Sequence, residues 1–175
     1  MNWPNRLSII RVLCIPIIIL LLYFPSGVTR WAAVFFFAFA CFTDFLDGHL
    51  ARKHQQITDF GKFIDPVADK LLVLSTLIML IHLDLVPAWM VILILARELS
   101  VDGLRLVAMT HQHVIAAGPL GKIKTTSQMV LILLLLTLRR PVFSFIPGII
   151  LGIWTAAITL WSGVDYFYRN RSLFQ

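Results

Sequence analysis

Long apolar runs separated by short polar segments extend along the whole chain. A helix needs about 20 mostly apolar residues to cross the hydrocarbon core of a bilayer. The pattern predicts six such helices, with expected ranges 7–24, 31–51, 62–83, 86–109, 121–138 and 143–167. The alternating strands of a membrane barrel are absent, which leaves helices as the spanning structure. We therefore expect an all-α membrane protein with a short interfacial segment before the first helix.

The composition supports this fold class. Hydrophobic residues make up 59% of the 175 residues and charged residues 14%, whereas soluble domains have roughly 45–50% and 25%. A soluble domain of this length could not bury so much apolar surface. The length predicts one domain over residues 1–175. Cys14 and Cys41 lie in apolar runs, where a free cysteine behaves as a small hydrophobe.

The charged residues predict an orientation. A basic start precedes the first apolar run and no small-residue cleavage pattern follows, so we expect a retained anchor rather than a signal peptide. Six crossings place both termini on one side, and twelve of the fifteen basic residues fall on that side: Arg6, Arg11, Arg52, Lys53, Lys62, Lys70, Arg97, Arg105, Lys122, Lys124, Arg169 and Arg171. The termini are therefore expected in the cytoplasm. In a membrane protein, the net charge of +6 indicates attraction to anionic lipids rather than to nucleic acid.

Four aspartates lie near the cytoplasmic ends of the second and third predicted helices. Asp44 and Asp47 are three residues apart, and Asp65 and Asp69 are four apart, so each pair shares one helix face. Clustered carboxylates repel one another and need compensation, from nearby basic side chains or from divalent metal. An all-oxygen set suits Mg²⁺ or Mn²⁺, and such sites commonly hold two ions about 4 Å apart around a phosphoryl group.

Each aspartate also has a simpler interpretation. Asp65, which precedes Pro66, could cap a helix, and Asp69 could be a first-turn acid favoured by the helix dipole. Asp44 and Asp47 could pair with the basic residues that follow them. All four together, with glycines between them, favour the functional interpretation.

The residues from 44 to 69 fit the pattern D-x2-D-G-x2-A-R-x8-G-x3-D-x3-D without departure. The sequence thereby resembles the CDP-alcohol phosphatidyltransferase family, and the six-helix layout extends the resemblance over the whole chain. Residues 2–11 (NWPNRLSIIR), Arg97-Glu98 and residues 121–128 (GKIKTTSQ) resemble the bacterial branch that makes phosphatidylglycerophosphate.

The resemblance implies a reaction of anionic phospholipid biosynthesis, in which CDP-diacylglycerol and sn-glycerol 3-phosphate give phosphatidylglycerophosphate and CMP. It implies that Asp44, Asp47, Asp65 and Asp69 hold the metals and that Asp69 is also the base towards the acceptor hydroxyl. CDP-diacylglycerol would contact Asp44, Gly48, Arg52 and Gly61. The glycines leave room for the nucleotide, and the planar fork of Arg52 would bind phosphate unless it only extends to the headgroups. The resemblance also implies a homodimer, and the absence of a transit peptide favours a bacterial plasma membrane with a cytoplasmic active site.

The phosphate of the acceptor needs a separate basic site. Arg97 and Arg105 are eight residues apart on one predicted helix, and Lys122 and Lys124 begin the next. Charges within membrane helices are expensive and usually functional. The arginines could instead neutralise Glu98 and Asp102, which we interpret as structural. The resemblance places the acceptor phosphate near the four basic residues.

Three other interpretations stay open on sequence alone. A transporter or cation channel could use the acids as an ion path, although such sites usually lie near the midplane between inverted repeats, and no repeat is visible. A purely structural membrane subunit has no need for four clustered acids. Within the family, the acceptor could be phosphatidylglycerol (as in cardiolipin synthesis), serine or inositol phosphate.

Overall fold

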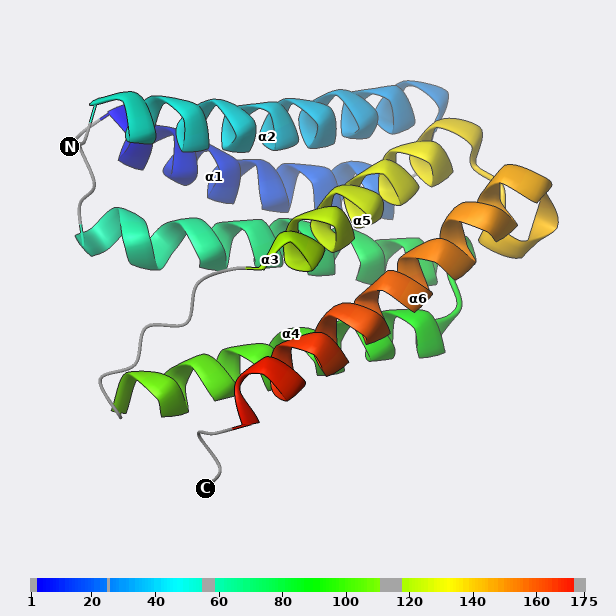
Figure 1. The fold of residues 1–175 in the computed structure, drawn as a ribbon. Helices are drawn as coiled ribbons and strands as arrows, with labels where there is room; N and C mark the ends of the chain where they lie inside the picture. The colour runs from blue at the N-terminus through cyan, green and yellow to red at the C-terminus, as the bar shows by residue number, and fades with distance from the viewer. Residues whose placement is uncertain (1–2, 25, 55–58, 111–117, 172–175) are drawn as a thin grey trace. The chain divides into compact units, whose positions relative to one another are not determined.

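The computed structural model describes the backbone of residues 3–24, 26–54, 59–110 and 118–171; within these ranges, the side chains of residues 3–8, 44–66 and 110 are outside the description. The described backbone is helical and contains no strand (Figure 1). The elements are α1 (Trp3–Tyr23), α2 (Gly27–His54), α3 (Asp59–His82), α4 (Ala88–Thr110), α5 (Pro119–Leu138), the short 3₁₀ helix η1 (Val142–Ser144) and α6 (Ile146–Arg169). Within the described residues, the predicted all-α fold with six long helices is confirmed, whereas the crossing of a membrane by all six stays a prediction.

The ends of the helices differ from the predicted ranges. Helix α1 already begins at Trp3, so no separate segment precedes it within the described residues, and α3 begins at Asp59 rather than at 62. The last predicted range, 143–167, is divided: η1 comes first, Phe145 is extended, and α6 then starts with a proline in its first turn. Proline has no N–H to donate and is favoured at a helix start, which explains this break.

The chain forms two compact units. The first unit consists of Met1–Leu83 and Ile132–Arg139, and within it α1 packs against both α2 and α3. Its core includes a stripe along α1 made by Cys14, Ile15, Ile18 and Leu22. These residues recur at the spacing of one helix face, so α1 is the central packing element of this unit.

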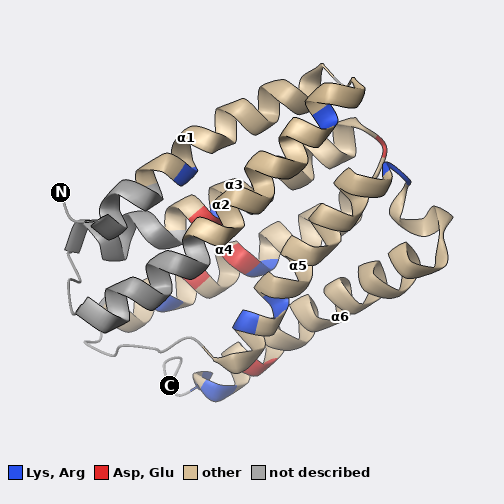
Figure 2. Ribbon diagram, turned by 90° about the horizontal axis from the view of Figure 1, so that it is seen from above, with Lys and Arg blue, Asp and Glu red and all other residues tan. Residues whose placement is uncertain are grey.

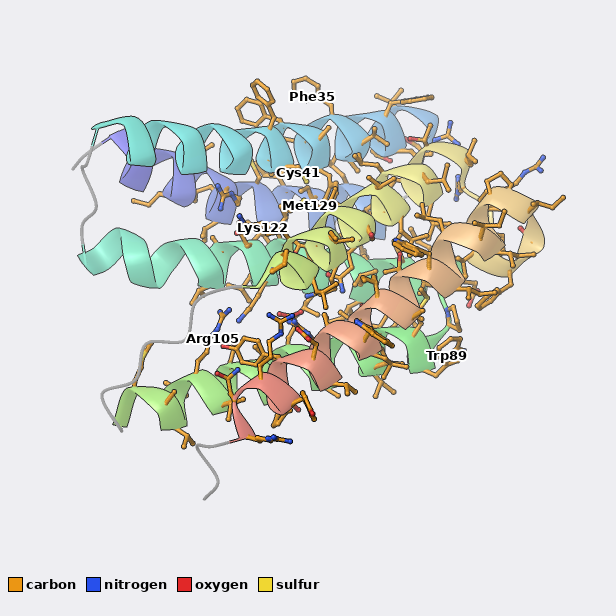
Figure 3. The ribbon with its side chains drawn as sticks, viewed as in Figure 1. Phe35, Cys41, Trp89, Arg105, Lys122 and Met129 are labelled. Atoms are coloured by element: carbon orange, nitrogen blue, oxygen red, sulfur yellow. The ribbon has the colours of Figure 1, made fainter. Side chains whose placement is uncertain are left out.

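The second unit consists of Asp84–Leu131 and Arg140–Gln175, and within it α6 packs against α4 and η1. Two glycines allow the close approach of η1 to α6. A Cβ atom on Gly148 would lie 2.5 Å from the carbonyl oxygen of Val142, and one on Gly152 would lie 2.7 Å from the Val142 side chain. Val142 also donates its backbone N–H to the carbonyl of Leu85, and Trp89, labelled in Figure 3, stacks on Phe143.

Among the described residues, two helices, α5 and α6, are long and apolar enough to cross a membrane. Shorter apolar stretches, Ile9–Tyr23 and Gly27–Thr43, lie in α1 and α2. Figure 2 shows long uncharged stretches of ribbon in α1, α5 and α6. Large apolar side chains are exposed on all six helices; Phe35, for example, projects outward from α2 (Figure 3).

The buried hydroxyl groups also suit apolar surroundings. Thr76 donates to the carbonyl of Leu72 at 2.8 Å, and Thr159 donates to that of Thr155 at 2.6 Å. Each hydroxyl thereby bonds to its own helix one turn earlier and needs neither water nor a second helix.

The close contact at Gly148 gives a prediction on stability. Gly148→Ala places a methyl group against a backbone carbonyl, and we expect the overpacking to lower the free energy of unfolding by about 1–3 kcal/mol. Gly103→Ala is the matched control, because nothing lies within 4 Å of that position in α4, and alanine should stabilise the helix there by roughly 0.5–1 kcal/mol. Denaturant titration in detergent measures both, and equal stability of the two variants would contradict the packing described.

Candidate functional site

The four aspartates of the motif lie on two helices of the first unit. Asp44 and Asp47 belong to α2, and Asp65 and Asp69 belong to α3. The helical backbone supports the prediction that each pair shares a face. Asp44, Asp47, Gly48, Arg52, Gly61 and Asp65 fall among the side chains outside the description, so their convergence stays a prediction. Among the described side chains, no group of three or more His, Cys, Asp or Glu residues could hold a metal ion.

The start of α3 removes the simpler interpretation of its two acids. Because α3 begins at Asp59, Asp65 is six residues inside the helix and Asp69 ten. Asp65 therefore does not cap the helix, and Asp69 is too far from the N-terminus to gain from the helix dipole, which acts within the first turn. Neither helix capping nor the helix dipole therefore accounts for the acids at positions 65 and 69.

Asp69 forms an ion pair with a residue from α1. The Nη1 group of Arg11 donates to Oδ1 of Asp69. The Arg11 side chain is fully buried, whereas 31% of the Asp69 side chain is exposed. Asp69, the acid predicted to act as catalytic base, is thus partly exposed and forms an ion pair with the buried guanidinium of Arg11.

Sequence reasoning counted Arg11 only as a charge that sets orientation. Helix α1 is apolar almost all round, so no buried face could be distinguished on it. The available signal was the spacing: Cys14, Ile15 and Ile18 follow Arg11 by three, four and seven residues and share its helix face. A basic residue in line with apolar ones on a packed helix needs an acidic partner.

In the second unit, Glu98 on α4 is the shared partner of two basic residues. It forms ion pairs with Lys124 of α5 and with Arg97, whose Nη1 lies 3.5 Å from the Glu98 carboxylate. All three side chains are largely buried. The pairing of Arg97 with Glu98 considered above is therefore confirmed, and Glu98 also fixes Lys124.

Arg97 lies close to glycines of two other helices. A Cβ atom on Gly163 of α6 would be 3.2 Å from Cγ of Arg97, and one on Gly121 of α5 would be 4.0 Å from its Nη2. The Nε of Arg97 and the Nε2 of Gln128 on α5 are buried and have no hydrogen-bond partner among the described residues. The second unit thus contains buried N–H donors that could form hydrogen bonds to oxygen atoms of a bound molecule.

Arg105 and Lys122, both labelled in Figure 3, differ in their contacts. Arg105 donates its Nε to the Tyr166 hydroxyl at 3.0 Å, and its guanidinium carbon lies 5.6 Å from the centre of that ring. Tyr166, on α6, was not singled out from the sequence. Lys122 is exposed and joins no ion pair with the described residues. Of the four predicted basic residues, the structure brings Arg97 and Lys124 together on Glu98 and supports Arg105 through Tyr166.

The comparison with known proteins identifies the family. The pattern of the CDP-alcohol phosphatidyltransferase family matches residues 1–161, and the chain belongs to this family. The chain is 42% identical to the CDP-diacylglycerol–glycerol-3-phosphate 3-phosphatidyltransferase of Bacillus subtilis, over 97% of this chain and 95% of the relative. It is 39% identical to the Rickettsia typhi protein of the same name, over 99% of both chains. A probable phosphatidylglycerophosphate synthase of Mycobacterium tuberculosis is 40% identical, over 96% of this chain and 81% of the relative.

The shared position of Glu98 gives a second prediction. Glu98→Gln removes the negative charge that pairs with the buried Lys124, so we expect the free energy of unfolding to fall by about 3–5 kcal/mol. Asp165→Asn is the control, since Asp165 pairs with the exposed Arg169 within α6, and a surface pair of this kind is worth at most about 1 kcal/mol. Denaturant titration in detergent compares the two variants. An effect of Glu98→Gln no larger than that of the control would show that the buried ion pair does not contribute to the stability of the fold.

Proposed function

We propose that the protein transfers the phosphatidyl group of CDP-diacylglycerol to sn-glycerol 3-phosphate and releases CMP, a step of anionic phospholipid synthesis. The observation that carries the proposal is the complete aspartate motif on α2 and α3, two helices that both pack against α1. Relatives at about 40% identity over nearly the whole chain are named for this reaction, which supports the choice of substrates. The chain is an enzyme of the family, and the roles below belong to the proposal.

Asp44, Asp47, Asp65 and Asp69 would hold divalent metal, Mg²⁺ or Mn²⁺, in two sites. The chemistry of the donor set fits: the motif offers only carboxylate oxygens, the ligands that these ions prefer. Bound metal would stabilise the negative charge that develops on the phosphoryl oxygens and on the departing CMP. Arg52 would bind the same diphosphate through its planar fork, and Gly48 and Gly61 would let the nucleotide approach the helix backbone.

Asp69 is the group that we assign to proton transfer. The hydroxyl oxygen of the acceptor attacks the phosphatidyl phosphorus, the bond from phosphorus to the CMP oxygen breaks, and the hydroxyl proton passes to the Asp69 carboxylate. A general base must come within hydrogen-bond reach of the proton it takes. The partial exposure of Asp69, in contrast to the full burial of Arg11, is compatible with this role.

The basic residues of the second unit suit the phosphate of the acceptor. Arg97, Lys124 and Arg105 carry three positive charges; two of them pair with Glu98, and Asp102 adds a second negative charge near Arg97. Leaving buried donors such as Arg97 Nε and Gln128 Nε2 without acceptors costs free energy, which a bound phosphate or hydroxyl would recover. Lys122 is exposed and would contribute only long-range attraction. A neutral acceptor would make no use of the positive charge of this cluster.

The proposal includes a location. We infer six crossings of a bacterial plasma membrane, with both termini and the active site in the cytoplasm. The exposed apolar side chains on all six helices and the two long apolar helices support a lipid environment. The protein would act as a homodimer, as the family resemblance implies.

The central prediction concerns CMP release by the purified protein in detergent with CDP-diacylglycerol. We expect turnover with Mg²⁺ or Mn²⁺ and sn-glycerol 3-phosphate, and little with glycerol, serine or phosphatidylglycerol, because these lack the phosphate monoester that the basic cluster would bind. EDTA should abolish the release, and added metal should restore it. Release that persists in EDTA would disprove the metal role, and preference for an acceptor without a phosphate monoester would disprove the acceptor assignment.

A further prediction separates acceptor binding from chemistry. Arg105→Ala should raise the KM for sn-glycerol 3-phosphate by about 10- to 100-fold, the loss of one charged hydrogen bond of about 1.5–3 kcal/mol, with the KM for CDP-diacylglycerol unchanged. Tyr166→Phe removes only the hydroxyl that accepts the hydrogen bond from Arg105 Nε, so it should raise the KM for sn-glycerol 3-phosphate by a smaller factor. Arg140→Ala, at an exposed position, should leave both constants unchanged. An unaltered KM for the acceptor in Arg105→Ala would exclude Arg105 from this site.

A further inference from the structure

Arg11 occupies a position that is unusual for an arginine. It lies on the buried face of α1 together with Cys14, Ile15 and Ile18, and none of its side chain is exposed. An arginine that only set the orientation of the chain would extend towards the headgroups. A guanidinium enclosed among apolar side chains needs a strong acidic partner.

Among the described side chains, Asp69, 58 residues later in the sequence, is an acidic partner of Arg11. The pair joins α1 and α3, and both helices belong to the first unit. The two side chains differ in burial: that of Arg11 is fully buried, whereas 31% of the Asp69 side chain is exposed. In the surface pair of α6 the arginine is the more exposed partner, with 64% for Arg169 and 27% for Asp165. Arg11 therefore stabilises Asp69 from the interior and leaves part of the acid accessible.

We propose that Arg11 is a positioning residue for Asp69, which holds Oδ1 of the carboxylate so that the group keeps one orientation during catalysis. An aspartate carboxylate otherwise rotates easily about its last torsion. A charge-assisted hydrogen bond from an arginine is strong and directional, and it fixes that torsion. Misplacement of a reacting group by about 1 Å can cost as much as roughly 100-fold in rate. The inference rests on the proposed function for the role of Asp69.

The test compares Arg11→Met and Arg11→Lys in the full-length protein, with two readouts: steady-state kinetics of CMP release and Mn²⁺ binding followed by electron paramagnetic resonance. In Arg11→Met, we expect kcat and Mn²⁺ affinity to fall by about 10- to 100-fold each, the range for partners of metal-binding side chains. The KM for sn-glycerol 3-phosphate should stay within about two-fold of the wild-type value, because the substitution removes no contact with the bound acceptor. Arg11→Lys keeps a cation and should recover part of both losses. Arg140→Met is the matched control at an exposed position and should match the wild type.

A double variant separates positioning from support of the fold. If Arg11 acts through Asp69, adding Arg11→Met to Asp69→Asn should change Mn²⁺ affinity by less than about two-fold, since coupled residues are not additive. An equal loss of affinity in both backgrounds would overturn the inference. Wild-type kcat in Arg11→Met would overturn it as well, and so would failure of both single variants to fold. If the wild type releases no CMP, the proposed function fails, while the Mn²⁺ titration still reports whether Arg11 acts through Asp69.

Discussion

The free-energy cost of placing charge among apolar side chains is the constraint on which the rest of the structure depends. Few charged side chains among the described residues are fully or largely buried, and two of their ion pairs join different helices: Arg11 of α1 with Asp69 of α3, and Lys124 of α5 with Glu98 of α4. Hydroxyl groups meet the same constraint by bonding to their own helices. A buried ion pair contributes little net stability compared with an apolar pair of similar volume. The fold alone therefore does not require charge at these positions, which agrees with the roles proposed for Asp69 and Lys124.

Each unit supplies one kind of chemistry. The first unit carries the aspartate motif, which suits a diphosphate bound through divalent metal. The second carries a basic cluster around Glu98 with further unpartnered donors, which suits a phosphate monoester. These are the charged groups of the two substrates in the proposed reaction. The name of the family and the names of the relatives agree with these two substrates.

The sequence allowed prediction of the features that have strong local signals. Six apolar runs marked the six helices, and the fixed spacing of the motif identified the family. The start of α3 was missed because Asp59 and Gly61 flank Phe60 and interrupt the apolar pattern there, although the helix includes all three residues. Arg11 was missed because α1 is apolar on every side. The choice of Lys124 and Arg97 as partners of Glu98 depends on how α4 and α5 pack, and several pairings fitted the spacing equally well.

The most direct measurement of the central claim is anomalous diffraction from a crystal of the protein soaked in Mn²⁺. The account predicts anomalous peaks about 2.0–2.2 Å from carboxylate oxygens contributed by both α2 and α3, with Asp69 among the ligands and Arg11 still bound to its other side. Manganese found only elsewhere, or the motif carboxylates turned towards separate surroundings, would contradict it.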